Sequence, residues 1–470
     1  MIVLDASIVN LAIPRAQEDL GIDAANVQWI VTAYTLAFGG LLLLGGRIAD
    51  YLGRKRMFIV GLLGFAVASL IGGLAPNEGL LFAARALQGV FAALMAPAAL
   101  ALISVTFHDP KERAKAFGVF GAIAGGGAAI GLLAGGLLTE YFSWRWCLAV
   151  NTPIAIVAAF LAVRYIRESR AEKGSTYDIP GALTVTLGLL ALVYGFTKAA
   201  PEGLQDTAAW TEPETLVWFV LAAVLLVAFV VIEKRSRSPL LPLRVVLERN
   251  RGGAYLSSLF VGAGMFAMFL FLGLYMQTIL GYSPVTAGLA FLPFSVGIIL
   301  GAGVASKLMP VVAPRYLMVP GLLAAAAGMF LLAQLTPESS YVTHLLGPMV
   351  LLSLGIAFVF VPTASVALHG AGTEDAGVAS AMINTSQQVG GSLGTALMNT
   401  VAVTTAAGFL AANAALGEAA LPSALTEGYT QGFLVGGVLM LVAAVIVGVL
   451  IRVGPDALQE IDSTGHVLAD

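Results

Sequence analysis

Two ionisable side chains, Asp5 and Arg85, lie well inside long apolar stretches of the sequence. If those stretches cross a bilayer, each charge costs at least ~2.5–3.5 kcal/mol at its centre, so it must face a cavity or a partner. A carboxyl group in such a place can hold or release a proton as its surroundings change. We predict that Asp5 binds protons or substrate and that Arg85 is its coupling partner. A purely hydrogen-bonding aspartate and an arginine that ties loop carbonyls remain the alternatives.

Uncharged polar side chains recur at helical spacing in other apolar stretches. Polar residues of membrane helices turn away from lipid, so they could line a transport cavity. They could equally hold helices together through hydrogen bonds. The candidates for cavity lining are Gln28, Thr32, Thr35, Gln88, Asn384 and Gln388.

A charged, glycine-containing turn occupies residues 46–56. Gly46 and Gly53 allow a tight turn, while Asp50 can cap a helix or pair with Arg54 and Lys55. By chemistry alone the segment is a charged cytoplasmic turn that sets topology and docks two helices.

A second glycine pattern gives one small face to a helix. Gly127, Gly131 and Gly135 recur every four residues, and Gly136 follows directly. Small residues at this spacing let another helix approach closely in a membrane. We therefore predict a helix-packing motif here.

The elements that position these residues must be membrane helices. Of 470 residues, 59% are hydrophobic and only 11% are charged, against roughly 25% charged in soluble domains. A spanning helix needs about 20 apolar residues. The sequence predicts fourteen spans, at residues 1–14, 27–46, 57–75, 80–104, 116–138, 147–164, 179–197, 215–232, 254–276, 285–306, 316–335, 345–366, 378–407 and 429–451.

The distribution of basic residues orients these spans. Twenty of the 24 Lys and Arg residues fall in alternate connections and in the C-terminal tail. The positive-inside rule therefore predicts that both termini are cytoplasmic, in a plasma membrane protein. The expected division is a six-helix bundle over 1–164, a two-span linker with basic flanks over 165–252, a second six-helix bundle over 253–452 and a short cytoplasmic tail over 453–470.

The first predicted span is unusually short. Fourteen helical residues reach only ~21 Å, against an apolar core of ~30 Å. From this shortfall we expect the native reading frame to extend upstream of Met1.

Five segments together resemble one transporter family. Residues 46–56 resemble the cytoplasmic signature of the major facilitator superfamily, and residues 80–93, with Arg85, resemble its second motif. The first resemblance implies a cytoplasmic gate formed by Gly46, Asp50, Gly53, Arg54 and Lys55. Residues 4–14 resemble the opening motif of its fourteen-span drug:proton antiporters, the EmrB/QacA-like exporters, with Ser7 in place of threonine. Residues 144–153 and 387–394 also fit that branch. The resemblance covers essentially the whole chain and implies an all-α fold of two six-helix bundles plus two central spans.

One departure concerns the antiporter motif at residues 127–136, where Leu132 replaces a proline. A helix without that proline lacks a built-in source of a kink. The departure leaves the expected fold unchanged but bears on gating by this helix.

The resemblance implies export of small amphipathic organic compounds, such as drugs or toxic metabolites, in exchange for protons. The partners are then a small-molecule substrate, protons and the lipid bilayer. A dedicated exporter of one endogenous metabolite, or a non-transporting membrane sensor on the same fold, remains open. No phosphate-binding loop, metal-ligand spacing or global basic patch occurs, so we expect no enzyme activity, cofactor, metal or nucleic acid.

Overall fold

The computed structural model describes residues 1–107, 110–169, 178–201, 209–236, 239–369 and 376–454, and all regular secondary structure in these ranges is helical. The N-terminal helices are α1 (Ile2–Leu20), α2 (Trp29–Leu52), α3 (Arg54–Gly73), α4 (Glu78–Thr106), α5 (Pro110–Tyr141), α6 (Arg145–Ala149) and α7 (Asn151–Tyr165). Two further helices follow, α8 (Ile179–Ala199) and α9 (Pro213–Arg235). The remainder comprises α10 (Leu243–Val246), α11 (Arg249–Leu274), η1 (Tyr275–Ile279), α12 (Pro284–Ala290), α13 (Leu292–Leu308), α14 (Pro314–Leu332), η2 (Tyr341–Leu346), α15 (Gly347–Leu368), α16 (Ala376–Ala412), η3 (Ala414–Ala420) and α17 (Leu421–Leu450).

Twelve helical segments within the described residues are long and apolar enough to cross a membrane, two fewer than the fourteen expected. The two that fall short are α1 and α5. Helix α1 carries Asp5, Arg15, Glu18 and Asp19, and the apolar part of α5 that can be assessed covers only Ala129–Tyr141. Both nevertheless pack lengthwise among the other helices.

The expected first span, 1–14, is wrong in its end point. Helix α1 continues through Pro14 to Leu20 and ends at Gly21, whose left-handed conformation (φ 62°) returns its N–H to the carbonyl of Gln17. The added helical turns are polar, and a span predicted from the apolar stretch alone therefore ends too early. At 1.5 Å per residue the 19 residues of α1 extend about 28 Å, against the ~21 Å expected for fourteen residues.

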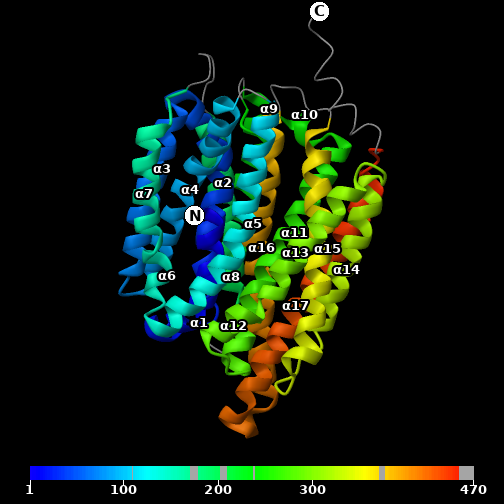
Figure 1. Cartoon of the computed structure of the whole chain (residues 1–470). Coiled ribbons are helices and arrows are strands. Elements are labelled where there is room, and N and C mark those ends of the chain that lie inside the picture. Colours follow the sequence, from blue (N-terminus) through cyan, green and yellow to red (C-terminus); the bar gives the residue numbers. More distant parts are fainter. Residues whose placement is uncertain (108–109, 170–177, 202–208, 237–238, 370–375, 455–470) are drawn as a thin grey trace, which may run out of the picture.

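Two groups of helices pack internally. Helices α1–α7 contact one another, chiefly through the pairs α2–α4, α3–α4, α1–α5 and α3–α7, whereas α11–α17 form a second group through α11–α16, α14–α15, α14–α17 and α13–α15. Figure 1 shows α3, α4 and α7 on one side of the molecule and α13, α14 and α15 on the other. The groups meet along α2–α16 and where α5 contacts α12.

Helix breaks occur where backbone hydrogen bonds are lost. The expected span at 285–306 is split at Phe291 into α12 and α13, because Pro293 lacks the N–H that would continue the hydrogen-bond ladder.

The connection expected at 408–428 is instead mostly helical, since α16 runs on to Ala412 and α17 begins at Leu421.

The pair α8–α9 lies against the seam between the two groups. Helix α8 contacts both α2 and α16, and the three share an apolar cluster around Leu36, Leu189, Val193 and Ala396. We refer to the end with the α2–α3 turn as the basic end and to the end with the α1–α2 connection (residues 21–28) as the far end.

Candidate functional site

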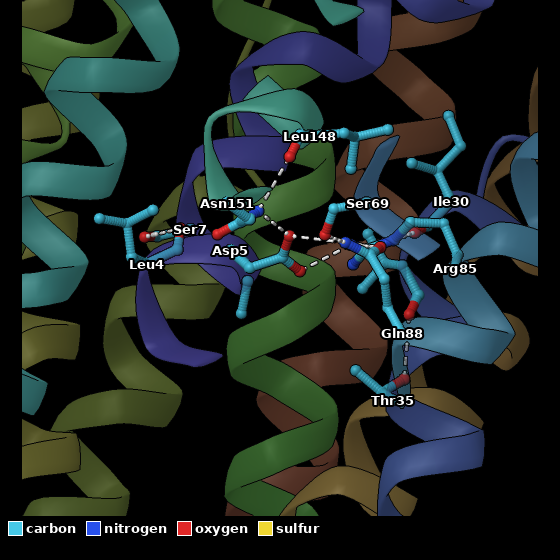
Figure 2. Close-up of polar contacts among 12 residues, drawn as sticks. Leu4, Asp5, Ser7, Ile30, Thr35, Ser69, Arg85, Gln88, Leu148 and Asn151 are labelled. Atoms are coloured by element: carbon cyan, nitrogen blue, oxygen red, sulfur yellow. Dashed lines mark hydrogen bonds and ion pairs between the residues drawn. The ribbon is translucent and has the colours of Figure 1, made fainter. Parts of the chain in front are cut away.

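Asp5 is fully buried on α1 and accepts hydrogen bonds from three side chains (Figure 2). Arg85 Nη1 donates to Oδ2 at 2.6 Å, forming an ion pair. Asn151 Nδ2 and Gln88 Nε2 donate to Oδ1, at 2.8 and 3.2 Å. These partners come from α4 and α7, so one carboxylate ties together three helices of the N-terminal group.

Arg85 makes more contacts than a simple charge pair requires. Its Nε donates to the backbone carbonyl of Ile30 at 2.8 Å, and Nη1 also donates to Gln88 Oε1 at 2.7 Å. The guanidinium carbon lies 4.6 Å from the centroid of the Tyr34 ring, a cation–π arrangement. The planar fork of arginine therefore connects α1, α2 and α4.

The pair is shielded from solvent. Asp5 and Arg85 are 0% and 1% exposed, and Gln88 passes its remaining N–H to Ser69 Oγ of α3 at 2.7 Å. Breaking a buried pair by removing one partner typically costs about 3–5 kcal/mol, because the other charge is left uncompensated.

The sequence singled out Asp5, Arg85 and Gln88, which the structure brings together. It missed Asn151 and Ser69. A neutral amide or hydroxyl in an apolar stretch costs little to bury when hydrogen-bonded, so it gives a much weaker signal than a charge.

The other five candidates for cavity lining are not among the hydrogen-bond partners of Asp5 and Arg85 named above. Thr32 and Thr35 donate to carbonyls of their own helix, and Gln28 donates to Thr197 Oγ1 of α8 at 3.1 Å. Gln388 is buried where α16 meets Gly39 of α2, whereas Asn384 is exposed. None of the six candidates borders the large cavity described below, and their role in transport stays a prediction.

At the basic end, Asp50 and Arg54 form the ion pair that the sequence suggested, with 2.8 Å between Arg54 Nη2 and Asp50 Oδ1. Lys55 does not join that pair, because Nζ donates to the carbonyl of Val163 at 2.9 Å. Gly46 lies inside α2 rather than in the turn, and a Cβ there would make ordinary contacts with Pro97.

Glu168, which the sequence did not single out, binds the start of α3. Its two carboxylate oxygens accept the backbone N–H groups of Lys55 and Arg56, each at 3.1 Å. Helix N-termini leave such groups without partners in the helix, and their dipole favours a negative charge. Only a contact across more than 100 residues reveals this role, so no local pattern could have predicted it.

The glycine face of α5 divides between two partners. A Cβ at Gly135 would lie 2.5 Å from the carbonyl oxygen of Ile8, and Gly131 faces Leu4 and Ser7, so both let α1 approach. Gly136 instead faces Pro284 of α12, at 2.7 Å from its carbonyl oxygen. A Cβ added at Gly127 would have no neighbour closer than 3.9 Å, so the absence of a side chain at this position is not needed for close helix packing.

Leu132 lies on the same helix and is fully buried. Helix α5 runs unbroken from Pro110 to Tyr141 through this position. The Leu132 carbonyl lies 2.8 Å from where a Cβ at Gly288 of α12 would be. The uninterrupted α5 thus contacts α12 through small residues on both helices.

A cavity of about 710 Å³ opens at the far end between the two helix groups. One wall comes from the end of α1 and the α1–α2 connection, and the others come from α11–η1, α12, α16 and α17. Figure 1 shows the end of α1 converging with α12 in this region. The volume is typical of pockets for small organic ligands.

Comparison with known proteins gives one family. Residues 1–395 match the Major Facilitator Superfamily. The chain is 48% identical over 466 residues to the puromycin resistance protein pur8 of Streptomyces alboniger, covering 98% of this chain and 91% of that protein. It is 40% identical over 405 residues to the cephamycin export protein CmcT of Amycolatopsis lactamdurans, covering 85% and 82%.

A further relative is the multidrug resistance protein Stp of Mycobacterium tuberculosis, 32% identical over 401 residues and covering 85% and 73%. Among solved structures, a POT family peptide transporter superposes with a TM-score of 0.66 at 15% identity, covering 95% of each chain. A bacterial homologue of the lysosomal transporter Spinster gives 0.62 at 15% identity, covering 98% and 96%. At these identities the structural matches establish the fold alone.

Proposed function

Because the chain belongs to the major facilitator superfamily, we propose that it is a secondary active exporter of small amphipathic organic compounds, driven by proton antiport. The relatives named for puromycin resistance, cephamycin export and multidrug resistance support export of drugs or toxic metabolites. Puromycin is the first substrate to test, given the 48% identity over nearly the whole chain.

The observation that carries proton coupling is the buried contact of Asp5 with Arg85. In this arrangement the Asp5 carboxylate accepts hydrogen bonds from one cation and two amides, which join α1 to α4 and α7. When a proton binds Asp5, the attraction to Arg85 is lost, but Arg85 keeps its bonds to Ile30 and Gln88. Helix α1 is then free to move relative to α4, so proton affinity and conformation depend on each other.

We infer the topology from the helix order together with the charge distribution. Adding α1 and α5 to the twelve apolar segments gives fourteen crossings, with the basic end in the cytoplasm and both termini on that side. The proposed division is one bundle over 1–164, the α8–α9 linker over 165–252 and a second bundle over 253–452. Reporter fusions after Pro201 and Asn413 should report the outside of the plasma membrane, and a cytoplasmic signal from either would refute this orientation.

The experiment that tests antiport uses energised everted vesicles. Puromycin should release protons from vesicles containing the parent chain, and Asp5→Asn should abolish this release at matched expression. Glu338→Gln, which alters an exposed carboxylate in the connection before η2, serves as the control and should behave as the parent. If Asp5→Asn pumps as well as the parent, Asp5 is structural and coupling occurs elsewhere.

Two alternatives differ in measurable ways. A dedicated exporter of one metabolite would show no competition between unrelated compounds, whereas a multidrug exporter would show mutual inhibition. A sensor on the same fold would bind puromycin without accumulating it in vesicles.

A further inference from the structure

We propose that Glu233 and Asp178 form a second proton-binding site, at the basic end of the α8–α9 pair and separate from Asp5. The proton resides on Glu233 and is shared with Asp178 through a hydrogen bond. The inference goes beyond the proposed function, because it concerns the two linker helices and requires no transport. Two buried carboxylates without a cation carry it.

Glu233 lies in the last turn of α9, a helix with few buried residues. Only Thr215, Ala222 and Glu233 are buried along its length, and Glu233 is 4% exposed. Its Oε2 accepts from the backbone N–H of Leu241 at 3.1 Å, in the connection to α10. Its Oε1 is buried and has no hydrogen-bond partner among the described residues. A buried carboxylate oxygen without a donor is costly and calls for an explanation.

Asp178 precedes α8 and shows the same pattern. The residue is 5% exposed, and its Oδ1 accepts from the N–H of Gly181 at 2.8 Å, which caps the first turn of α8. Its Oδ2 is buried, and no donor from the part of the chain that the structure describes reaches it. Each carboxylate therefore has one oxygen satisfied by a backbone N–H and one oxygen left over.

The packing of α8 on α9 brings the two carboxylates together. Gly188 of α8 lies against Leu226 of α9, and the two helices are antiparallel. Two turns further toward the basic end on each helix, this register places Gly181 beside Glu233. Because Asp178 caps Gly181, its carboxylate lies near that of Glu233, and the charge of Asp178 acts on Glu233.

The other charged groups at this end do not neutralise the two carboxylates. On α9, Lys234 and Arg235 are exposed, as is Arg244 on α10. Helix α2, which packs on α8, contributes Arg47 and Asp50, and Asp50 is already in an ion pair. Helix α16, the other neighbour of α8, contains no charged residue. Within the described ranges, no ion pair includes either carboxylate.

The helix ends decide which carboxylate holds the proton. Asp178 lies at the N-terminus of α8, where the helix dipole favours a negative charge, whereas Glu233 lies at the C-terminus of α9, where the dipole opposes one. Two like charges at close range also disfavour ionisation of both groups. A proton on Glu233 Oε1 makes that atom a donor, and Asp178 Oδ2 is the acceptor available to it. Both leftover oxygens are then satisfied.

The proton connects three parts of the chain. Glu233 already binds the connection at Leu241, which leads through α10 to α11, the first long helix of the second group. The shared proton adds the start of α8 to this contact. Without the proton, the two negative charges repel each other, and the end of α9 is pushed away from α8.

Infrared spectroscopy of the detergent-solubilised full chain detects the proton directly, through the carbonyl stretching band of a protonated carboxyl group. At neutral pH the parent should show a band that Glu233→Gln lacks. Glu212→Gln, at an exposed position at the other end of α9, is the matched control and should keep the band. Identical spectra of the parent and Glu233→Gln would overturn the site.

A second variant keeps Glu233 and alters its partner. Asp178→Asn can still cap Gly181 through its amide oxygen, but it removes the neighbouring negative charge. Glu233 should then release its proton more readily, so the band should vanish at a lower pH than in the parent. A band that vanishes at the same pH in both would show that Asp178 does not share the proton.

The pH dependence of the melting temperature gives an independent measurement. In the unfolded chain glutamate loses its proton near a pKa of about 4.3, whereas the folded chain keeps the proton on Glu233 to higher pH. The melting temperature of the parent should therefore fall relative to that of Glu233→Gln as the pH rises above about 4.3. A difference that stays constant with pH would overturn the site.

Sodium ions distinguish a proton from a metal cation at the same carboxylates. The parent should melt at the same temperature in sodium chloride and in choline chloride of equal concentration. Stabilisation of the parent by sodium that Glu233→Gln lacks would assign a metal cation to the site and overturn the proton. None of these measurements contains a transport step, so their outcome does not depend on whether Asp5 drives antiport.

Discussion

The carboxylate of Glu168 lies so close to Gly53 that a Cβ at Gly53 would come within 2.7 Å of its carbon and one of its oxygens. Gly53 also has φ 116°, a conformation that residues with a side chain rarely adopt. The glycine is therefore required twice: for the backbone turn between α2 and α3, and for the approach of Glu168 to the start of α3.

Gly53→Ala should consequently disrupt this junction. The new methyl group would displace Glu168 and expose the N–H groups of Lys55 and Arg56, which we expect to destabilise the turn by about 1–3 kcal/mol. Thermal unfolding in detergent measures the loss. Gly408→Ala, a position on α16 with nothing within 4 Å, should unfold as the parent does; equal melting of both variants would contradict the role of Gly53.

The α5 glycines allow a matched comparison on one helix. Gly135→Ala would push a methyl group against the Ile8 carbonyl and separate α1 from α5, at a cost of about 1–3 kcal/mol. Gly127→Ala meets nothing closer than 3.9 Å and should be tolerated. Folded yield and melting temperature of the two variants measure the difference. Similar losses in both would show that the contact with α1 is not responsible, because helix propensity by itself favours alanine over glycine.

Arg85→Lys tests whether geometry or charge holds the buried site together. Lysine keeps the charge but cannot supply Nε to Ile30 and Nη1 to Asp5 and Gln88 in one planar group. We expect puromycin efflux to fall at least ten-fold at matched expression. Efflux close to that of the parent would mean that the charge alone suffices.

The sequence predicted the features that follow from the free-energy cost of burying a charge in a membrane. Asp5 and Arg85 are expensive in a membrane unless paired, so their pairing could be inferred before the partner geometry was known. The hydropathy pattern predicted the position of most helices. It misplaced the end of α1, because the helix becomes polar there while its backbone hydrogen bonds continue to Leu20. Backbone breaks such as Phe291 depend on local hydrogen bonding, which average hydropathy does not register.

Contacts between distant segments could not be predicted. Glu168 reaches α3, and Asn151 reaches Asp5, over more than 100 residues in each case. Neither residue has a local pattern that names its partner. The cavity at the far end likewise arises only from the packing of distant segments, namely α1, α11–η1, α12, α16 and α17.

Thr197 lets the α8–α9 pair hold both helix groups together. Its hydroxyl oxygen accepts from Gln28 Nε2 and from Trp29 Nε1 of the N-terminal group, each at 3.1 Å. The neighbouring Phe196 carbonyl accepts from Thr400 Oγ1 of α16 at 2.7 Å. One turn of α8 therefore joins α2 to α16 at the far end of the seam.

Thr197→Val should weaken this join while preserving side-chain shape. The buried Gln28 and the half-buried Trp29 each lose an N–H acceptor, at up to about 1–3 kcal/mol for a group left unsatisfied. We expect a lower melting temperature and faster hydrogen exchange in peptides covering residues 193–200 and 25–32. Thr184→Val is the matched control, because Thr184 bonds only within α8, to the carbonyls of Pro180 and Gly181. If both variants exchange at the same rate at these peptides, the bonds to Thr197 do not hold α8 against α2.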